Sequence, residues 1–289
     1  MVSYVEQTTF WSMLRKERFF SLTMTLDQLK QFRSGVYTIL GNGKDALFDL
    51  MDAVLVTRSV YSFVELSLSP VFRRRWSSIY EALEDSNPPR EELMQLYIKQ
   101  LPQTEQLVLA GDHTAWPRLE AVTLKERTYE HQTQPMSGTK PVTLGQGYST
   151  ISIIPETKGS WALPLLHERI TSFSNPIEKA ASQLRLVCQH LPTRPMTLWD
   201  AEYGCASFVK QTVDIAADKL MRSRSNRVLY GAPPPYTGIG RPRVHGDKFK
   251  FNDPTTWCNP NQILEVNDPK MGRLRQRLWW NGTKKRENR

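Results

Sequence analysis

The stretch Leu107-Val-Leu-Ala-Gly-Asp-His-Thr-Ala-Trp-Pro-Arg118 decides the fold of this chain. Four apolar residues and a glycine lead into Asp112, and a polar turn closed by Pro117 follows. We therefore expect a short strand over 107–110 that ends on a carboxylate. An isolated carboxylate is costly to bury, so Asp112 either caps a loop or lies against a cation.

A second apolar run repeats this pattern later in the chain. Met196-Thr-Leu-Trp leads into Asp200, which follows Asp112 by 200 − 112 = 88 residues. Two carboxylates a few ångströms apart repel each other unless a cation lies between them, and carboxylate oxygens suit Mg²⁺ or Mn²⁺. Each aspartate alone fits a capping role better. The repeated pattern favours a different hypothesis, in which Asp112 and Asp200 lie on adjacent strands and bind one divalent cation together.

Residues 104–230 alternate between short β-rich runs and helical patterns. Strands are predicted over 107–110, 148–154, 160–166, 196–199 and 225–230, with a hairpin turn at 156–159. One predicted helix begins with Asn175 as its cap and Pro176 in its first position, and a second spans 206–221. This order predicts an α/β fold, with parallel strands beside an antiparallel hairpin.

Residues 1–103 are predicted to be helical. Thr25, three residues before Gln28, is typical of a capping box, and Asn87-Pro-Pro-Arg-Glu-Glu marks a later helix start. Arg73, Arg74 and Arg75 lie between aromatic residues, an arrangement that suits phosphate contact and base stacking. A solvated helix start explains the same arginines equally well. We place a domain boundary after Leu101-Pro102.

Charge and composition restrict the class of partner. The 289-residue chain carries a formal net charge of +9 and has a pI near 9.5, which favours a nucleic acid as partner. There is no apolar run of the roughly 18 residues needed to span a bilayer, and the amino terminus lacks the pattern of a secretory signal. The three cysteines form no Cys-x-x-Cys pair. We expect a cytoplasmic protein without a membrane partner, a disulfide framework or a four-cysteine zinc site.

Several segments in the chain's order resemble those of a known enzyme family. The segments 110–118, 198–208 and 220–230 resemble the first-aspartate, second-aspartate and following basic segments of DDE-superfamily insertion-sequence transposases. Gly240-Arg-Pro-Arg-Val-His-Gly-Asp-Lys-Phe resembles a basic segment that follows the fifth strand in such enzymes. The resemblance covers most of the chain from about residue 104 onward. The ordered set is specific, although no single motif is.

This resemblance implies an α/β fold with an RNase H-like mixed sheet and flanking helices, preceded by an all-helical domain. It implies a helical DNA-binding domain over 1–103, a partial catalytic core over 104–230 and a basic insertion or tail over 231–289. Asp112 and Asp200 become the first and second acids of a two-metal site for Mg²⁺ or Mn²⁺. The implied activity is strand cleavage and strand transfer on double-stranded DNA at transposon ends, by a homo-oligomer.

A set of basic residues is expected to line the DNA path beside the two acids. Taken singly, each of these residues fits plain solubilising charge equally well, whereas the cluster favours contact with phosphates. The set is Arg222, Arg224, Arg227, Arg241, Arg243, Lys248 and Lys250.

The chain departs from the family pattern at the third acid, which in such enzymes lies on a helix beyond an inserted segment. The late acids Glu265, Asp268 and Glu287 lie in no amphipathic helical pattern, so we assign no third ligand. We expect a truncated chain, either a decayed copy or one part of a split reading frame, which binds DNA and cleaves it poorly. Two alternatives are an RNase H-like nuclease or resolvase and a non-catalytic DNA-binding remnant.

Overall fold

The computed structural model describes residues 25–101, 107–131, 142–155, 161–268 and 272–279. The chain divides into two units, one formed by 1–198 with 214–219 and the other by 199–213 with 220–289. The predicted hairpin turn at 156–159 and Glu287 lie outside the described residues. No helix in the described ranges is long and apolar enough to cross a membrane.

Residues 25–101 of the first unit are mainly helical, as predicted. Its helices are α2 (Leu26–Ile39), α3 (Lys44–Val56), α4 (Phe63–Leu66), α5 (Ser77–Asp85) and α6 (Arg90–Ile98). The capping box is confirmed, because the backbone N–H of Gln28 donates to Thr25 Oγ1 and that of Thr25 donates to Gln28 Oε1. Two apolar clusters hold these helices together. They consist of Val36, Leu40, Ala46, Leu47 and Ala82, and of Leu50, Ala53, Leu66, Phe72 and Ile79.

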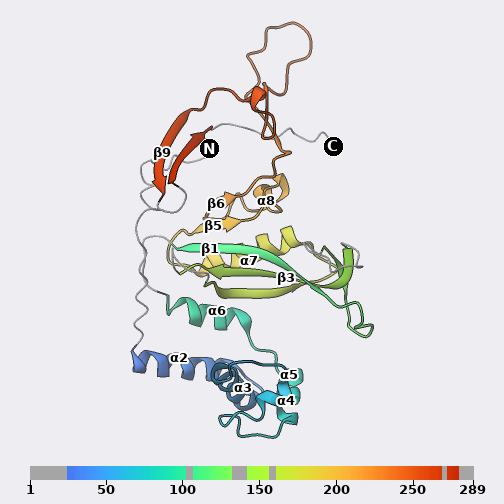
Figure 1. Ribbon diagram of the computed structural model, residues 1–289, viewed down its shortest axis with the longest axis vertical. Coiled ribbons are helices and arrows are strands. Elements are labelled where there is room, and N and C mark those ends of the chain that lie inside the picture. The colour runs from blue at the N-terminus through green and yellow to red at the C-terminus, as the bar shows by residue number, and fades with distance from the viewer. Residues whose placement is uncertain (1–24, 102–106, 132–141, 156–160, 269–271, 280–289) are drawn as a thin grey trace. The chain divides into compact units, whose positions relative to one another are not determined.

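A six-stranded mixed sheet follows (Figure 1). Its strands are β1 (Val108–Pro117), β2 (Thr128–His131), β3 (Val142–Ile153), β4 (Leu163–Ile170), β5 (Met196–Trp199) and β6 (Asp218–Met221). The order is β2-β3-β1-β5-β6, and β4 also pairs with β3. β3 is antiparallel to β1, β2 and β4. β6 runs parallel to β5, since the N–H groups of Asp218 and Arg222 donate to the carbonyls of Pro195 and Trp199. The mixed sheet with flanking helices confirms the expected RNase H-like α/β fold.

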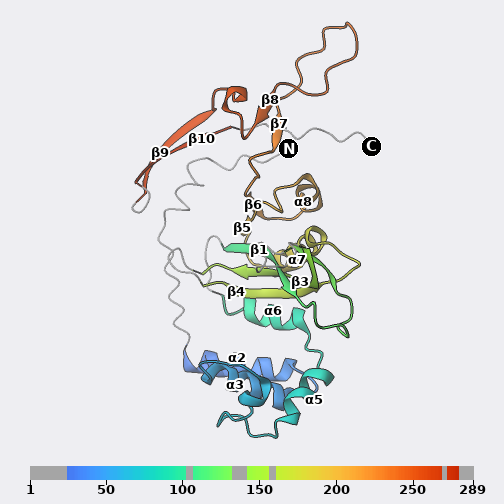
Figure 2. The ribbon, with the colours of Figure 1, turned by 45° about the vertical axis from the view of Figure 1, so that its right-hand side comes forward.

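Helix α7 (Pro176–His190) covers one face of this sheet. Its predicted start is confirmed, because Asn175 Oδ1 accepts the N–H of Glu178 and Pro176 occupies the first turn. Gln183 anchors the helix to β3: Ser149 Oγ lies 2.6 Å from Gln183 Oε1, and Gln183 Nε2 donates to the Ser149 carbonyl. Figure 2 shows α7 beside the sheet and α6 next to β4.

Three sequence predictions about this core were wrong. The strand at Asp112 does not end there but runs to Pro117, because β3 pairs with it continuously from Leu109 to Pro117. The helix predicted over 206–221 is only α8 (Ala206–Gln211), since 218–221 form the parallel pairing of β6 with β5. The strand predicted over 225–230 is β7 (Val228–Tyr230), which pairs with β8 (Lys248–Lys250) outside the main sheet.

Hairpin-like elements dominate the second unit. Beyond β7 and β8 it contains the 3-10 helix η1 (Pro254–Thr256) and the antiparallel strands β9 (Gln262–Asp268) and β10 (Gly272–Leu278). Four aromatic rings pack around β8, with Phe249 stacked 5.7 Å from Trp257. The other two are Phe251 and Trp279. The basic tail predicted from sequence therefore contains regular structure of its own.

Candidate active site

Asp112 lies in the middle of β1 on its exposed face. Because side chains alternate along a strand, Asp112, Thr114 and Trp116 point to one side, where all three are exposed. Asp112 lies opposite Thr150 of β3. Its Oδ1 accepts the backbone N–H of His113 at 2.8 Å. The carboxylate is thus presented from a paired, regular strand rather than from a loop.

His113 points to the opposite, covered face of β1. Its Nε2 lies 3.1 Å from Glu130 Oε2, and the Thr128 hydroxyl donates to Glu130 Oε1 at 2.6 Å. Gly147 leaves room for this pair, since a Cβ there would come within 2.8 Å of both His113 Nε2 and Glu130 Oε1. The pair links β1 to β2 across Gly147 of β3, on the face of β1 opposite to that of Asp112.

Asp200 directly follows β5, as predicted, and is exposed. Its Oδ1 accepts the N–H of Glu202 at 2.9 Å, which forms a tight turn at the strand end. The residues around it are anchored by three buried aromatic rings, those of Trp199, Tyr203 and Phe208, with centroids 4.6 to 5.3 Å apart. A rigid apolar cluster therefore holds the base of the Asp200 turn.

The two acids come from neighbouring strands, since β5 adjoins β1 in the sheet. Exposed carboxylate oxygens are the donor type that Mg²⁺ and Mn²⁺ prefer, so both residues fit such an ion chemically. Within the described ranges, no group of three or more His, Cys, Asp or Glu side chains is arranged to hold a metal. The shared cation stays a prediction.

Arg222 and Arg224 belong to the same unit as Asp200 and share a pocket of about 690 Å³. Ala201, Ser223, Ser225 and Phe251 complete its lining. The loop after β5 and the loop after β6 approach closely at Gly204, where a Cβ would lie 2.4 Å from the Arg222 carbonyl oxygen. Both arginines are exposed. The pocket therefore brings two guanidinium groups next to the residue that follows Asp200.

The remaining predicted basic residues of the second unit do not line this pocket. Arg227 is half-buried, and Arg241, Arg243 and Lys248 are exposed. Lys250 Nζ lies 3.4 Å from Asp253 Oδ2. Among the late acids, Glu265 forms an ion pair with Arg273 across the β9–β10 hairpin.

The arginines of the helical region support the local fold. Arg73 Nη2 lies 2.8 Å from Asp49 Oδ1, a carboxylate buried in α3, and this hydrogen bond raises the pKa of the Arg73 guanidinium. Arg74 forms ion pairs with Asp45 at 3.2 Å and with Asp49 at 3.5 Å. Arg75 is exposed. Their predicted contact with DNA stays a prediction.

Sequence reasoning missed the aromatic side chains on the same sheet face as Asp112. Trp116, Tyr148 and His167 come from three adjacent strands and contact one another in series. The signal was present in His113-Thr-Ala-Trp, which continues the alternation of a strand, but we interpreted it as a turn because of the polar residues and Pro117.

The sequence matches a known family over most of its length. Residues 36–286 match the family described as DDE superfamily endonuclease. No curated protein matches the chain.

Proposed function

Because the chain belongs to the DDE superfamily endonuclease family, we propose that it binds double-stranded DNA and cuts DNA strands, with Asp112 and Asp200 as the ligands of Mg²⁺ or Mn²⁺. Enzymes of this family generally use divalent metal ions. One observation carries the proposal: the two exposed carboxylates come from adjacent strands of the sheet. Asp112 lies on β1, and Asp200 directly follows the neighbouring strand β5.

The carboxylates would hold the cation against the scissile phosphate. When bound, a divalent ion activates a water or hydroxyl and stabilises the leaving oxygen of an in-line displacement. The chain's own contribution is positional: the paired strand β1 fixes Asp112, and the buried aromatic cluster fixes the turn of Asp200. Among the described residues no group of three metal-ligating side chains is present. Two carboxylates alone leave one ion of a metal pair short of ligands, so we expect cleavage to be slow.

The pocket of Arg222 and Arg224 would receive a DNA phosphate next to Asp200. Guanidinium groups bind phosphate oxygens through paired N–H donors, and the Ser223 and Ser225 side chains of the same pocket carry further donors. Arg227, Arg241, Arg243, Lys248 and Lys250 would extend this path along the second unit. The chain's formal charge of +9 favours such contacts with negative phosphates.

Within the family, transposition is the specific role that we propose. The helical region 25–101 would bind transposon ends, with Arg73, Arg74 and Arg75 at the phosphates. Strand transfer would follow cleavage, and two or more copies of the chain would hold the two ends. The helices α2 to α6, which precede the sheet in the chain, support this role over that of a simple nuclease.

A nicking assay tests the catalytic proposal. Supercoiled plasmid is incubated with the purified chain and Mg²⁺ or Mn²⁺, beside Asp112→Asn and Asp200→Asn. We expect slow nicking that requires the metal and falls at least about 100-fold in each variant, a loss of several kcal/mol in the transition state. Nicking at equal rates by the variants would contradict the proposal. Fast nicking that vanishes in Asp200→Asn would show that the chain supplies a third ligand.

The salt dependence of DNA binding tests the phosphate pocket. Each phosphate contact contributes about 0.9 to the slope of log affinity against log salt concentration. Because the pocket would hold one phosphate, replacing both Arg222 and Arg224 by Gln should lower the slope by about 0.9. Arg194→Gln is the matched control, since this exposed arginine is held by Asp218. An unchanged slope in the double variant would remove these two residues from the DNA path.

A further inference from the structure

An aromatic ladder crosses the sheet face that carries Asp112. Trp116, Tyr148 and His167 lie on β1, β3 and β4. The Trp116 and Tyr148 rings meet edge to face with centroids 6.0 Å apart, and Tyr148 stacks on His167 at 5.0 Å with an interplanar angle of 3°. The Arg118 guanidinium carbon lies 3.9 Å from the centre of the Trp116 ring. The ladder thus joins the exposed Trp116 and His167 and the half-buried Tyr148 to a cation.

The ladder lies outside the apolar core. Trp116 is 51% exposed, and His167 is also exposed. The Thr150 hydroxyl lies 2.7 Å from His167 Nδ1, which holds the imidazole plane parallel to the Tyr148 ring. Large aromatic rings at the surface, held in fixed orientations by neighbours, are typical of binding surfaces.

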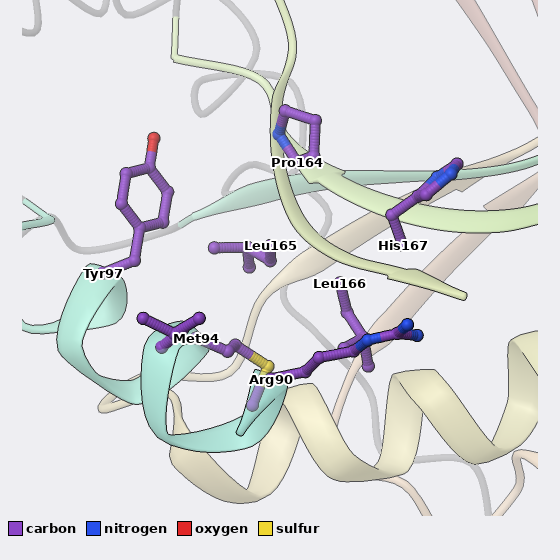
Figure 3. Close-up of a pocket in the computed structure, with 8 residues that line it drawn as sticks. Arg90, Met94, Tyr97, Pro164, Leu165, Leu166 and His167 are labelled. Carbon is purple, nitrogen blue, oxygen red and sulfur yellow. The ribbon is translucent and has the colours of Figure 1, made fainter. Parts of the chain in front are cut away.

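A pocket of about 330 Å³ lies at the His167 end of the ladder, between α6 and β4 (Figure 3). Its apolar lining consists of Leu93, Met94, Pro164, Leu165 and Leu166. Arg90, Tyr97 and His167 supply the polar groups. The Tyr97 hydroxyl is a neutral hydrogen-bond donor at physiological pH, and burial raises its pKa further above the ordinary value of 10.0. This combination of an apolar lining with a few polar groups suits a flat group with polar edges and the size of a nucleobase.

Resting on the proposed function, we propose that the ladder and the pocket bind unpaired DNA bases beside the cleavage site. Bases would stack on Trp116 and along Tyr148 and His167, and a further base would enter the pocket between α6 and β4. Arg118 and Arg90 would meet the accompanying phosphates. Stacking needs only the π face of a base, so the site would accept single strands of any sequence.

The position of the ladder relates this binding to cleavage. Trp116 is four residues beyond Asp112 on the same face of β1, a distance of about 14 Å at 3.4 Å per residue. A strand whose end is unpaired would therefore lie on the ladder while its paired part approaches the carboxylates. The ladder would favour DNA that is frayed or opened next to the scissile phosphate over fully paired DNA.

Binding measurements without metal test this inference. The full chain in EDTA is titrated with a single-stranded oligonucleotide and with the matching duplex, as wild type, Trp116→Leu and Trp116→Phe. We expect Trp116→Leu to weaken single-strand binding about tenfold and duplex binding at most twofold, since stacking acts on exposed base faces. Trp116→Phe should retain most of the affinity. Trp161→Leu is the matched control, because Trp161 is 71% exposed and lies off the ladder.

A spectroscopic readout separates stacking from a loss of folding. A single-stranded probe carrying 2-aminopurine should lose fluorescence on binding to the wild type and to Trp161→Leu, and should lose much less with Trp116→Leu. Equal single-strand affinity in Trp116→Leu, or equal losses for both DNA forms, would overturn the inference. These binding assays contain no metal and are therefore independent of the nicking assay. If base stacking is observed and nicking is not, only the catalytic proposal is refuted. If nicking is observed and base stacking is not, only the inference about the ladder is refuted.

Discussion

The two faces of the β1–β3–β4 sheet are built from the same strands and differ in almost every other respect. The face under α7 carries Ile151, Ile153 and the buried Ser149–Gln183 pair. The other face carries Asp112 and Trp116, both exposed. Neighbouring residues in a strand alternate between faces. The ten residues of β1 therefore place one set of side chains on the covered face and the residues proposed to act on DNA on the other.

This division has a measurable consequence. Changes on the covered face should lower the free energy of unfolding, because they remove packed contacts or leave polar groups without partners. Changes on the exposed face should leave the free energy of unfolding almost unchanged and alter DNA binding or cleavage.

The largest loss of stability is expected for Gln183→Ala. The change removes both hydrogen bonds to Ser149 and leaves a cavity under β3. We expect the free energy of unfolding in urea to fall by about 2 to 4 kcal/mol. The matched control is Gln189→Ala, which removes an exposed glutamine from the same helix. Similar losses in the two variants would show that α7 is not anchored through Gln183.

A pH effect is expected at Cys188, on the same helix. Burial raises the pKa of the Cys188 thiol from 9.0 to about 11, while the charge of Lys219 acts in the opposite direction. The folded state then holds the thiol proton more tightly than the unfolded state, so this stabilisation is complete below pH 9 and is lost as the pH rises to about 11. A rise of two units in the thiol pKa corresponds to about 2.7 kcal/mol of stability. Because Cys188 is partly exposed, we expect about 1 to 2 kcal/mol.

The comparison that isolates the thiol is wild type against Cys188→Ala between pH 8 and pH 11. Burial lowers the pKa of Lys219, and the contribution of this burial to stability rises with pH in both proteins and cancels in the difference. The attraction between the Cys188 thiolate and Lys219 is present in the wild type alone and opposes its loss of stability. As the pH rises, the free energy of unfolding of the wild type should fall relative to that of Cys188→Ala. A difference that stays constant over this range would mean that the thiol is solvated in the folded chain.

A smaller loss is expected for Asn175→Ala at the start of α7. The side chain of Asn175 satisfies the N–H of Glu178, which otherwise has no partner within the helix. We expect a loss of about 1 kcal/mol in the free energy of unfolding. Asn175→Ser keeps a capping oxygen and should recover most of it. Equal stability of the Ala and Ser variants would show that the cap contributes nothing here.

The smallest change in stability is expected on the exposed face, at Thr114→Ala. Thr114 is exposed and lies opposite Tyr148 on the face of Asp112. We expect a change in the free energy of unfolding within about 0.5 kcal/mol, which is typical of surface positions. A loss comparable to that of Gln183→Ala would break the distinction between the two faces.

Local signals in the sequence predicted much of the fold, and tertiary pairing decided the rest. The start of α7 was predictable because Asn175 and Pro176 have fixed roles at helix starts. The position of Asp200 after a short apolar run was predictable for the same local reason. The length of β1 was not, because its polar second half is strand only through pairing with β3.

The misassigned end of the 206–221 segment has a similar cause. Its apolar residues fit a helical stripe, but pairing with β5 draws 218–221 into the sheet. The aromatic ladder escaped prediction since Trp116, Tyr148 and His167 are far apart in sequence and meet only across strands. The two candidate acids could be predicted because each follows an apolar run in the sequence. The residues around them could not, because those neighbours come from strands that pair only in the folded sheet.

The joint binding of one divalent cation by Asp112 and Asp200 is the central claim, and Mn²⁺ titration followed by electron paramagnetic resonance tests it most directly. The proteins compared are the wild type, Asp112→Asn, Asp200→Asn and the double variant. A shared site predicts that each single change weakens Mn²⁺ binding more than about tenfold and that the double change adds little. Single variants that bind Mn²⁺ as tightly as the wild type, or losses that add fully in the double variant, would contradict it.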